Sequence, residues 1–309
     1  MYFPVLRAKQ NELIGIRELA ERVDAQTVRP VFEPVREKVD SLLKTVCHLN
    51  QYGIEPLLII NPSLGDFSNE DINFMDLIES ADYPELKFLP CFSTKNNKID
   101  LAEKFLNTLD SFALYLEGSY SKEWEPYIAR AEIVLILGDA PPKLLESAKK
   151  RVYIADAFQA QNKNKDYPEV SNFNSNWLTE YEDRRNCIGF GDYTILDTDY
   201  SESGGPAYVV TLHLSYIDAN EYDAIKVRHF QSYDDNSPTQ PGLKFKSALD
   251  SLIKYVNENT HLFFISFGIE NFRTLYTQKH FPGLGQVKKN SIQHHIETIT
   301  DYLYKKSRG

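Results

Sequence analysis

Residues 112–137 read FALYLEGSYSKEWEPYIARAEIVLIL. Two short apolar runs, 112–116 and 132–137, enclose an amphipathic stretch at 123–129. Runs that are apolar throughout, rather than alternating with polar residues, are typical of strands covered on both faces. The segment therefore predicts a strand, a helix and a second strand of a parallel sheet.

The same alternation extends from the N-terminus to residue 194. Eight runs are predicted to be strands: 3–6, 30–35, 56–60, 87–92, 112–116, 132–137, 152–155 and 187–194. Seven segments between them are predicted to be helices: 11–23, 39–52, 71–80, 99–108, 123–129, 142–149 and 175–183. This count favours an α/β fold, a closed TIM-like (β/α)8 barrel. An open doubly wound sheet is the alternative, but no Gly-x-Gly-x-x-Gly follows the first strand.

The pattern changes after the eighth strand. Residues 207–216 and 224–230 predict two antiparallel strands of a hairpin, inserted at about 200–235. Loops are predicted at 161–176, 200–206 and 234–242, and the last two flank the hairpin. Helical spacing returns at 243–256, which we expect to supply the last outer helix of the barrel. We therefore predict a barrel over 1–260 and a helical extension over 261–309 packed on it. This extension is basic, with seven Lys or Arg against three Asp or Glu.

Composition excludes several classes of protein. Hydrophobic residues make up 42% of the 309 residues and charged residues 25%, as in globular proteins. The net charge of -10 argues against a protein that coats nucleic acid or anionic membrane. Cys47, Cys91 and Cys187 are too few and too widely spaced for a disulfide framework. With no signal-peptide pattern and no apolar run of membrane-spanning length, we expect a cytoplasmic protein.

Polar residues follow most of the predicted strands. Because the carboxyl ends of barrel strands meet at one mouth, where TIM-barrel active sites lie, we expect these residues to surround one opening. They are Arg7 and Lys9, Glu33, Asn61, Ser93 and Thr94, Glu117, Asp139, Asp156 and Asp192.

Three interpretations of this set stay open. In the first, Glu33, Asp156 and Asp192 hold a divalent metal such as Mg²⁺, which activates water and clamps a phosphate. In the second, Arg7 and Lys9 bind an anionic group while one of the acids, Glu33, Asp156 or Asp192, acts as general base. In the third, Arg7, Lys9 and Glu33 form a structural ion-pair cluster and the other acids cap helices.

Further candidates lie near the eighth strand and in the hairpin. The glycines of Gly189-Phe190-Gly191-Asp192-Tyr193 allow close approach of a backbone, and Tyr193 is placed to stack on a ligand. His213 and His229 approach each other if the two hairpin strands pair, so we include both among the ligand-binding candidates. The adjacent pair His294-His295 is expected on the surface, as is the basic helix that carries it.

Three short motifs resemble the bacterial and phage "beta protein" family. They are the opening Tyr2-x-Pro4-x-Leu6-Arg7-x-Lys9-x-x-Glu12-Leu13, the pair Glu33-Pro34, and Gly191-Asp192-Tyr193 followed by a hairpin. The resemblance covers residues 1 to about 230. It implies a (β/α)8 barrel of undemonstrated chemistry, encoded near mobile elements and phage-defence genes, with Lys9, Glu33 and the 191–193 turn at the mouth. Arg228 and His229 depart from the pattern in the hairpin.

Two functions follow from these predictions. The first is a barrel enzyme, a metal-assisted hydrolase, or a binder of a phosphorylated or nucleotide-like ligand, with Arg7, Asn61, Glu117, Tyr193, His213 and His229 as ligand contacts. The second is a non-catalytic component of a phage-defence or toxin-type system, in which the hairpin and the basic tail dock a protein encoded by a neighbouring gene.

Overall fold

The computed structural model describes residues 1–68, 72–81, 83, 86–96, 98–118, 120–202 and 205–308. The chain forms two compact units. The first consists of Met1–Leu13, Asp24–Asp156 and Thr179–Asp192, and the second of Ile14–Val23, Ala157–Leu178 and Tyr193–Gly309. The boundary predicted at residue 260 falls inside the second unit.

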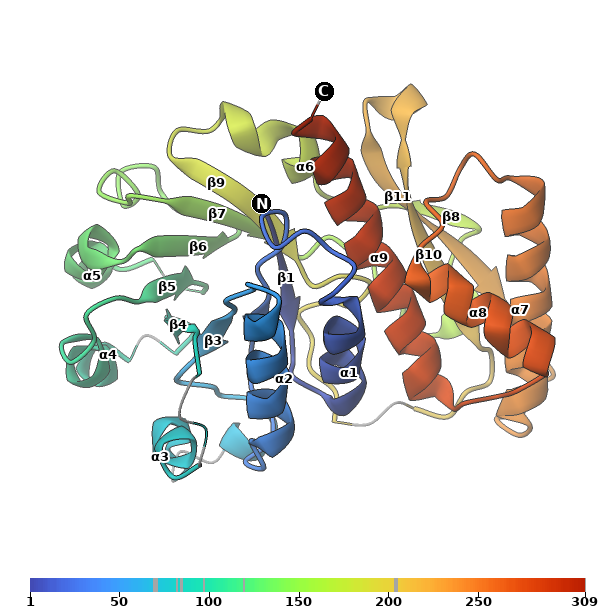
Figure 1. Ribbon diagram of the computed structural model, residues 1–309, viewed down its shortest axis with the longest axis horizontal. Coiled ribbons are helices and arrows are strands. Elements are labelled where there is room, and N and C mark those ends of the chain that lie inside the picture. Colours follow the sequence, from blue (N-terminus) through green and yellow to red (C-terminus); the bar gives the residue numbers. More distant parts are fainter. Residues whose placement is uncertain are drawn as a thin grey trace. The chain divides into compact units, whose positions relative to one another are not determined.

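The first unit contains a closed barrel of eight parallel strands, so the predicted α/β barrel is confirmed (Figure 1). The strands, in barrel order, are β1 (Tyr2–Leu6), β2 (Val31–Phe32), β3 (Leu57–Ile59), β4 (Leu89–Ser93), β5 (Ala113–Leu116), β6 (Ile133–Leu137), β7 (Arg151–Ala155) and β9 (Cys187–Asp192). Each lies within or one residue beyond a run predicted as a strand. The one that follows β7 in the barrel is β9, because β8 belongs to another sheet.

Helices connect most of these strands. They are α1 (Gln10–Leu19), α2 (Asp40–Gln51), α3 (Phe74–Glu79), α4 (Ile99–Leu106), α5 (Glu125–Arg130) and α6 (Trp177–Glu180), with short 3-10 turns at Gly65–Ser68, Lys122–Trp124 and Tyr181–Asp183. The prediction of a helix at 142–149 is wrong. That segment closes with i→i+3 hydrogen bonds, from the amide of Leu144 to the carbonyl of Pro141 and from Leu145 to Pro142. These bonds close turns, in place of the i→i+4 bonds of an α-helix.

Alternation along the strands separates the inner and outer faces of the barrel. On β5, Leu114 and Leu116 pack outward in one cluster with Leu106 of α4 and with Trp124 and Ile128. Their neighbours Ala113 and Tyr115 therefore point inward, since successive side chains of a strand point to opposite faces. The strands are apolar on both faces because the outer face packs against helices and the inner face fills the interior of the barrel.

Close contact between the first and last strands closes the barrel. Phe3 of β1 pairs with Gly191 of β9. A Cβ atom on Gly191 would lie 2.0 Å from the carbonyl oxygen of Phe3 and 2.7 Å from Cδ1 of Ile154. A Cβ atom on Gly189 would lie 2.1 Å from the carbonyl oxygen of Met1. The predicted close approach of a backbone at these glycines is confirmed, and the approaching backbone is β1.

The second unit is built on a three-stranded antiparallel sheet in the order β10 (Thr211–Asp218), β11 (Ala224–Gln231) and β8 (Val170–Asn172). The predicted hairpin is confirmed as β10 and β11. The strand β8 lies in a segment predicted to be a loop, and that prediction is wrong. Three residues with one apolar side chain give no periodic signal, and β8 becomes a strand by pairing with β11.

Three helices complete the second unit: α7 (Pro241–Glu258), α8 (Phe267–Gln278) and α9 (Leu284–Lys306). The prediction that residues 243–256 form an outer helix of the barrel is wrong. The apolar stripe of α7, including Leu249 and Leu252, packs in one cluster with Leu212 and Leu214 of β10. The hairpin needs this cover, because three strands without a packed face are not stable in water.

The helix α9 runs beside β10, the edge strand of this sheet (Figure 1). His294 and His295, expected on the surface, are fully buried there. Nε2 of His294 lies 2.7 Å from the carbonyl oxygen of Ser215, and Nδ1 of His295 lies 2.6 Å from the hydroxyl of Ser215. An edge strand presents backbone groups that lack strand partners, and the imidazole of His294 bonds to one of them, the carbonyl group of Ser215.

The expectation of a solvated basic helix is also wrong for part of α9. Lys289 is 6% exposed, and its Nζ atom lies 2.6 Å from Oε2 of Glu18 in α1. Gln293 donates to the same carboxylate oxygen at 2.8 Å. Among the helices of the described ranges, none has the length and apolar character needed to cross a bilayer.

Candidate functional site

Five polar residues share the inner face of the barrel at the carboxyl ends of consecutive strands. Strand register places Val5, Val31 and Leu57 on one face, in line with Leu89 of β4. Residues two apart on a strand point to the same face. The inner face at the ends of β1 to β5 therefore carries Arg7, Glu33, Asn61, Ser93 and Glu117.

These side chains bond to one another. Arg7 and Glu33 form an ion pair and both are buried. The hydroxyl of Ser93 donates to Oε1 of Glu117 at 2.5 Å. Asn61 exchanges two hydrogen bonds with the backbone of Ser93, each of 2.8 Å. Each group of the set thus has a partner within it, which supports a structural role at this end of the barrel.

Asp192, also predicted at the mouth, lies on the other face of its strand. Asp192 pairs in register with Pro4 and Ala155, whereas Gly191 pairs with Phe3 and Ile154 of the inner face. Asp192 therefore points outward, and its Oδ1 atom accepts a hydrogen bond of 2.6 Å from the hydroxyl of Tyr2. The predicted place of Asp192 at the mouth is wrong, because one residue of register reverses the face of a strand.

Asp156 is exposed at the end of β7, Lys9 is half-buried, and Tyr193 is buried beyond the end of β9. Within the described residues, no three His, Cys, Asp or Glu side chains lie close enough together to hold a metal ion. Glu33, Asp156 and Asp192 are thus not brought together as one ligand set.

The second unit brings two predicted site residues into direct contact. His213 of β10 and His229 of β11 lie opposite each other in register, and their Nδ1 atoms are 2.7 Å apart. The Nε2 atom of His229 lies 2.8 Å from the hydroxyl of Ser171 on β8. The ring of Tyr167 stacks on His229, with centroids 4.7 Å apart, and meets His213 edge-on at 4.9 Å.

Burial keeps both histidines neutral at pH 7. Desolvation lowers the pKa of His229 to about 4. It also lowers the pKa of His213 well below 6.5, assisted by the charges of His229 and Lys288. Between two neutral rings, one Nδ1 atom donates the hydrogen bond and the other accepts it.

His213 lines a cavity of about 680 Å³ that lies wholly within the second unit. Three lysines from two segments border it: Lys163 and Lys165 from the loop before β8, and Lys288 from the first turns of α9. Its other lining side chains include the aromatic rings of Phe158, Tyr167 and Tyr208, the amides of Asn162 and Asn164, and the carboxylates of Asp197 and Asp234. This size and this mixture of aromatic and charged groups are typical of small-molecule sites.

Polar contacts fasten the cavity wall to the sheet. Asn164 donates from Nδ2 to the carbonyl oxygen of Val209 at 2.8 Å, and Gln231 donates to the carbonyl oxygens of Asn164 and Tyr167, both at 2.9 Å. Lys165 and Asp234 form an ion pair of 3.6 Å between two parts of the lining. These contacts hold the wall of the cavity against the sheet.

A fully buried lysine holds another part of the same wall. Nζ of Lys244 donates to the carbonyl oxygen of Tyr208 at 2.6 Å, to that of Ser237, and to Oδ1 of Asp235 at 2.7 Å. The ammonium group lowers the pKa of Asp235 mainly through this hydrogen bond. The contacts tie α7 to the segments at 208 and 235–237.

Sequence reasoning missed several residues of this site, chiefly Phe158, Lys163, Tyr167 and Ser171. They lie in or beside the segment 161–176, which the sequence predicts to be a loop. The signal that could have found them is Tyr167 together with two lysines in a stretch otherwise rich in Asn and Ser. This signal is weak, because only folding brings the loop against the hairpin.

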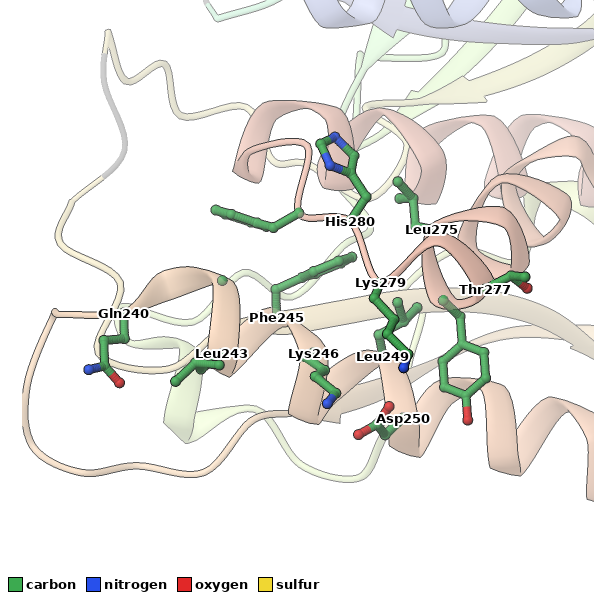
Figure 2. A pocket seen from close by; sticks show the side chains of 13 residues that line it. Gln240, Leu243, Phe245, Lys246, Leu249, Asp250, Leu275, Thr277, Lys279 and His280 are labelled. Carbon is green, nitrogen blue, oxygen red and sulfur yellow. The ribbon is translucent and has the colours of Figure 1, made fainter.

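A second pocket, of about 860 Å³, lies between α7, α8 and the segment after α8 (Figure 2). Its apolar lining includes Phe245 and Leu249 of α7 and Leu275 of α8. Leu243 and Tyr276, which also line it, are 55% and 45% exposed. Its charged lining residues are Lys246, Asp250 and Lys279. We refer to this pocket as the α7–α8 groove.

Comparison with known proteins identifies no relative: no protein-family model, no curated protein and no solved structure matches the chain. The resemblance to the "beta protein" family stays a prediction that rests on the three short motifs. The residues and their geometry must therefore support any proposed function.

Proposed function

We propose that this protein binds a small phosphorylated or nucleotide-like molecule in the cavity beside His213. The observation that carries the proposal is the convergence of Lys163, Lys165 and Lys288 with the ring of Tyr167 on one cavity of about 680 Å³. Lysine ammonium groups bind phosphate oxygens, and an aromatic face accepts a planar base or ring. The metal-assisted hydrolase predicted from the strand-end acids receives no support from the polar set inside the barrel, whose groups bond to one another.

Replacing Lys288 by alanine should weaken the binding of ATP or AMP by about tenfold to a hundredfold, because one charge-assisted hydrogen bond contributes about 1.5–3 kcal/mol. Lys288 is exposed, so its removal should leave the fold intact. Titration calorimetry of ATP, AMP and inorganic phosphate against the wild type and Lys288→Ala measures the change.

The matched control is Lys254→Ala, which removes an exposed lysine on α7 that does not line this cavity. Its affinity should equal that of the wild type. Equal affinities for Lys288→Ala and Lys254→Ala, or no binding of any of the three compounds to the wild type, would overturn the proposed function.

The α7–α8 groove favours a second candidate function, the docking of a partner protein. An open apolar groove bordered by Lys246 and Lys279 suits a partner segment that presents apolar side chains beside carboxylates. This occupant corresponds to the product of a neighbouring gene, which the protein docks if it is the predicted non-catalytic component. The groove belongs to the helices after the hairpin, which include the basic tail.

Replacing Leu243 by glutamate should abolish such docking, because a carboxylate would then face both the apolar lining and the carboxylates of the partner. The measurement is co-elution in size-exclusion chromatography after co-expression with the product of each flanking gene. Lys254→Ala serves as the control and should co-elute like the wild type. Absence of any co-eluting product with the wild type, or its retention by Leu243→Glu, contradicts this second function.

A further inference from the structure

Three side chains on the three strands of the sheet form a continuous hydrogen-bonded chain. Ser171 on β8 lies 2.8 Å from Nε2 of His229 on β11, and Nδ1 of His229 lies 2.7 Å from Nδ1 of His213 on β10. Strand register fixes the order, since His229 is paired with His213 and Ser171 is paired with Val227, two residues before His229. The chain is thus positioned by the sheet itself rather than by a flexible loop.

The hydrogen-bonded chain of side chains ends at the cavity, at His213. Nδ1 of His213 bonds to His229, which leaves Nε2 as the second nitrogen of a ring that lines the cavity. His213 is half-buried and lines the cavity, whereas His229 is 5% exposed and stacked under Tyr167. The imidazole that borders the cavity therefore has one nitrogen committed to the chain and one available to a ligand or to water.

The groups around His213 keep that nitrogen unprotonated at pH 7. On α9, Lys288 faces it, and on β11 the second histidine does; both lower the pKa of His213 below 6.5, in addition to burial. Tyr167 packs on both rings, and Lys163, Lys165, Asp197 and Asp234 line the same cavity. At pH 7 the ring is neutral, and a neutral imidazole can accept a proton.

We propose that His213 is the general base of phosphate-ester hydrolysis in this cavity, with His229 and Ser171 as positioning residues behind it. The inference rests on the proposed function, because it requires a phosphorylated ligand beside His213. It adds a reaction to what is otherwise a binding site.

The proposed reaction begins with one tautomer of the chain. Nδ1–H of His213 donates to Nδ1 of His229, and Nε2–H of His229 donates to the hydroxyl of Ser171. Nε2 of His213 then has its lone pair free and takes a proton from water. The water oxygen bonds to phosphorus as the bond from phosphorus to the ester oxygen breaks. The electron pair of that bond leaves with the ester oxygen, which takes the proton back from Nε2. The products are an alcohol and inorganic phosphate, with no change of oxidation state.

The positive charge that forms on His213 is stabilised along the chain. The imidazolium keeps its hydrogen bond to Nδ1 of His229, whose own orientation is fixed by Ser171. The ammonium groups of Lys163 and Lys288 would balance the charge of the phosphate oxygens. Each of these residues either lines the cavity or belongs to the hydrogen-bonded chain.

The test uses p-nitrophenyl phosphate, which carries a ring and a phosphate, and follows the release of p-nitrophenol. His213→Gln should lower kcat about a hundredfold or more, the contribution expected of a general base. Lys254→Ala, the matched control, should retain the wild-type rate. Binding of inorganic phosphate, measured by calorimetry, should persist in His213→Gln within a few fold.

A second measurement separates positioning from a merely structural role. His229→Gln removes a group that lowers the pKa of His213, so the acid limb of the pH–rate profile should move to higher pH. Ser171→Thr, which keeps the hydroxyl, should restore most of the rate that Ser171→Ala loses. An unchanged pH profile in His229→Gln shows that His229 does not act through His213.

The outcomes distinguish the two proposals. If the wild type binds inorganic phosphate but does not hydrolyse p-nitrophenyl phosphate, or if His213→Gln hydrolyses it at the wild-type rate, the catalytic inference is overturned and the binding function stands. If the wild type binds none of the phosphate compounds, the proposed function is overturned as well.

Discussion

Replacing Gly191 by alanine should lower the free energy of unfolding of the protein by about 3 kcal/mol, at the upper end of the usual cost of overpacking. The new Cβ atom would lie 2.0 Å from the carbonyl oxygen of Phe3, a backbone atom of the neighbouring strand. Backbone cannot rotate away as a side-chain end can, so β1 and β9 would have to separate. These two strands close the barrel, and their separation would affect every ladder that depends on closure.

Urea denaturation measures this effect, followed by the fluorescence of Trp124, which is fully buried against the barrel strands. The matched control is Gly205→Ala, because a Cβ atom at Gly205 meets no atom within 4 Å. The control should stay within about 0.5 kcal/mol of the wild type, as substitutions without new contacts usually do. Equal stabilities of the two variants would show that the contact between β1 and β9 is not as tight as described.

Acidification from pH 7.5 to pH 5 should destabilise the protein, and His294 alone should contribute about 2 kcal/mol of the loss. His294 is fully buried, and desolvation lowers its pKa from 6.5 to about 4. Between these two values the unfolded chain binds a proton that the folded chain does not. The contribution of neutral His294 to the free energy of unfolding is therefore fully present above pH 6.5, and it is lost as the pH falls toward 4.

The contacts of His294 explain why its neutral form is preferred. Its Nε2–H group donates to the carbonyl oxygen of Ser215, which can only accept. Its Nδ1 atom lies 2.8 Å from the hydroxyl of Ser266, and that hydroxyl also accepts from the amide of Ile269 at the start of α8. Protonation of Nδ1 would remove the acceptor of the Ser266 hydroxyl proton and place a positive charge at the N-terminus of a helix, where it is disfavoured.

The measurement compares urea denaturation at pH 7.5 and pH 5 for the wild type, His294→Gln and His280→Gln. His294→Gln should be less stable at pH 7.5 but should lose about 2 kcal/mol less than the wild type on acidification. His280 is exposed, so the His280→Gln control should lose as much as the wild type. A wild-type pH dependence in His294→Gln would assign the acid sensitivity to other groups, of which His213 and His229 are the first to consider.

Local pattern was enough to predict most elements of this protein. Continuous apolar runs identified all eight barrel strands, and alternating residues identified the hairpin of β10 and β11. The glycines at 189 and 191 indicated a close approach of backbone. These features are readable because each depends on the period or the size of side chains a few residues apart.

The errors concern partners that are distant in sequence. The strand β8 exists because β11 offers it an edge, and the buried state of His294 and His295 follows from the edge of β10 beside α9. Asp192 was assigned to the mouth because it ends a strand, but the register of β9 against β1 and β7 turns it outward. In each case the deciding contact spans tens to hundreds of residues.

The amino-acid sequence by itself determined the barrel, the hairpin and the proximity of His213 to His229, because periodicity and a short turn are local properties. Only the tertiary structure decided that Ser171, Tyr167 and the lysines of two segments surround that histidine pair. A cavity is the space left between segments, and its lining depends on how the loop before β8 and the first turns of α9 pack around the sheet. No period or motif along the chain encodes that packing directly, which is why the strongest candidate site lies outside the strand ends that the sequence favoured.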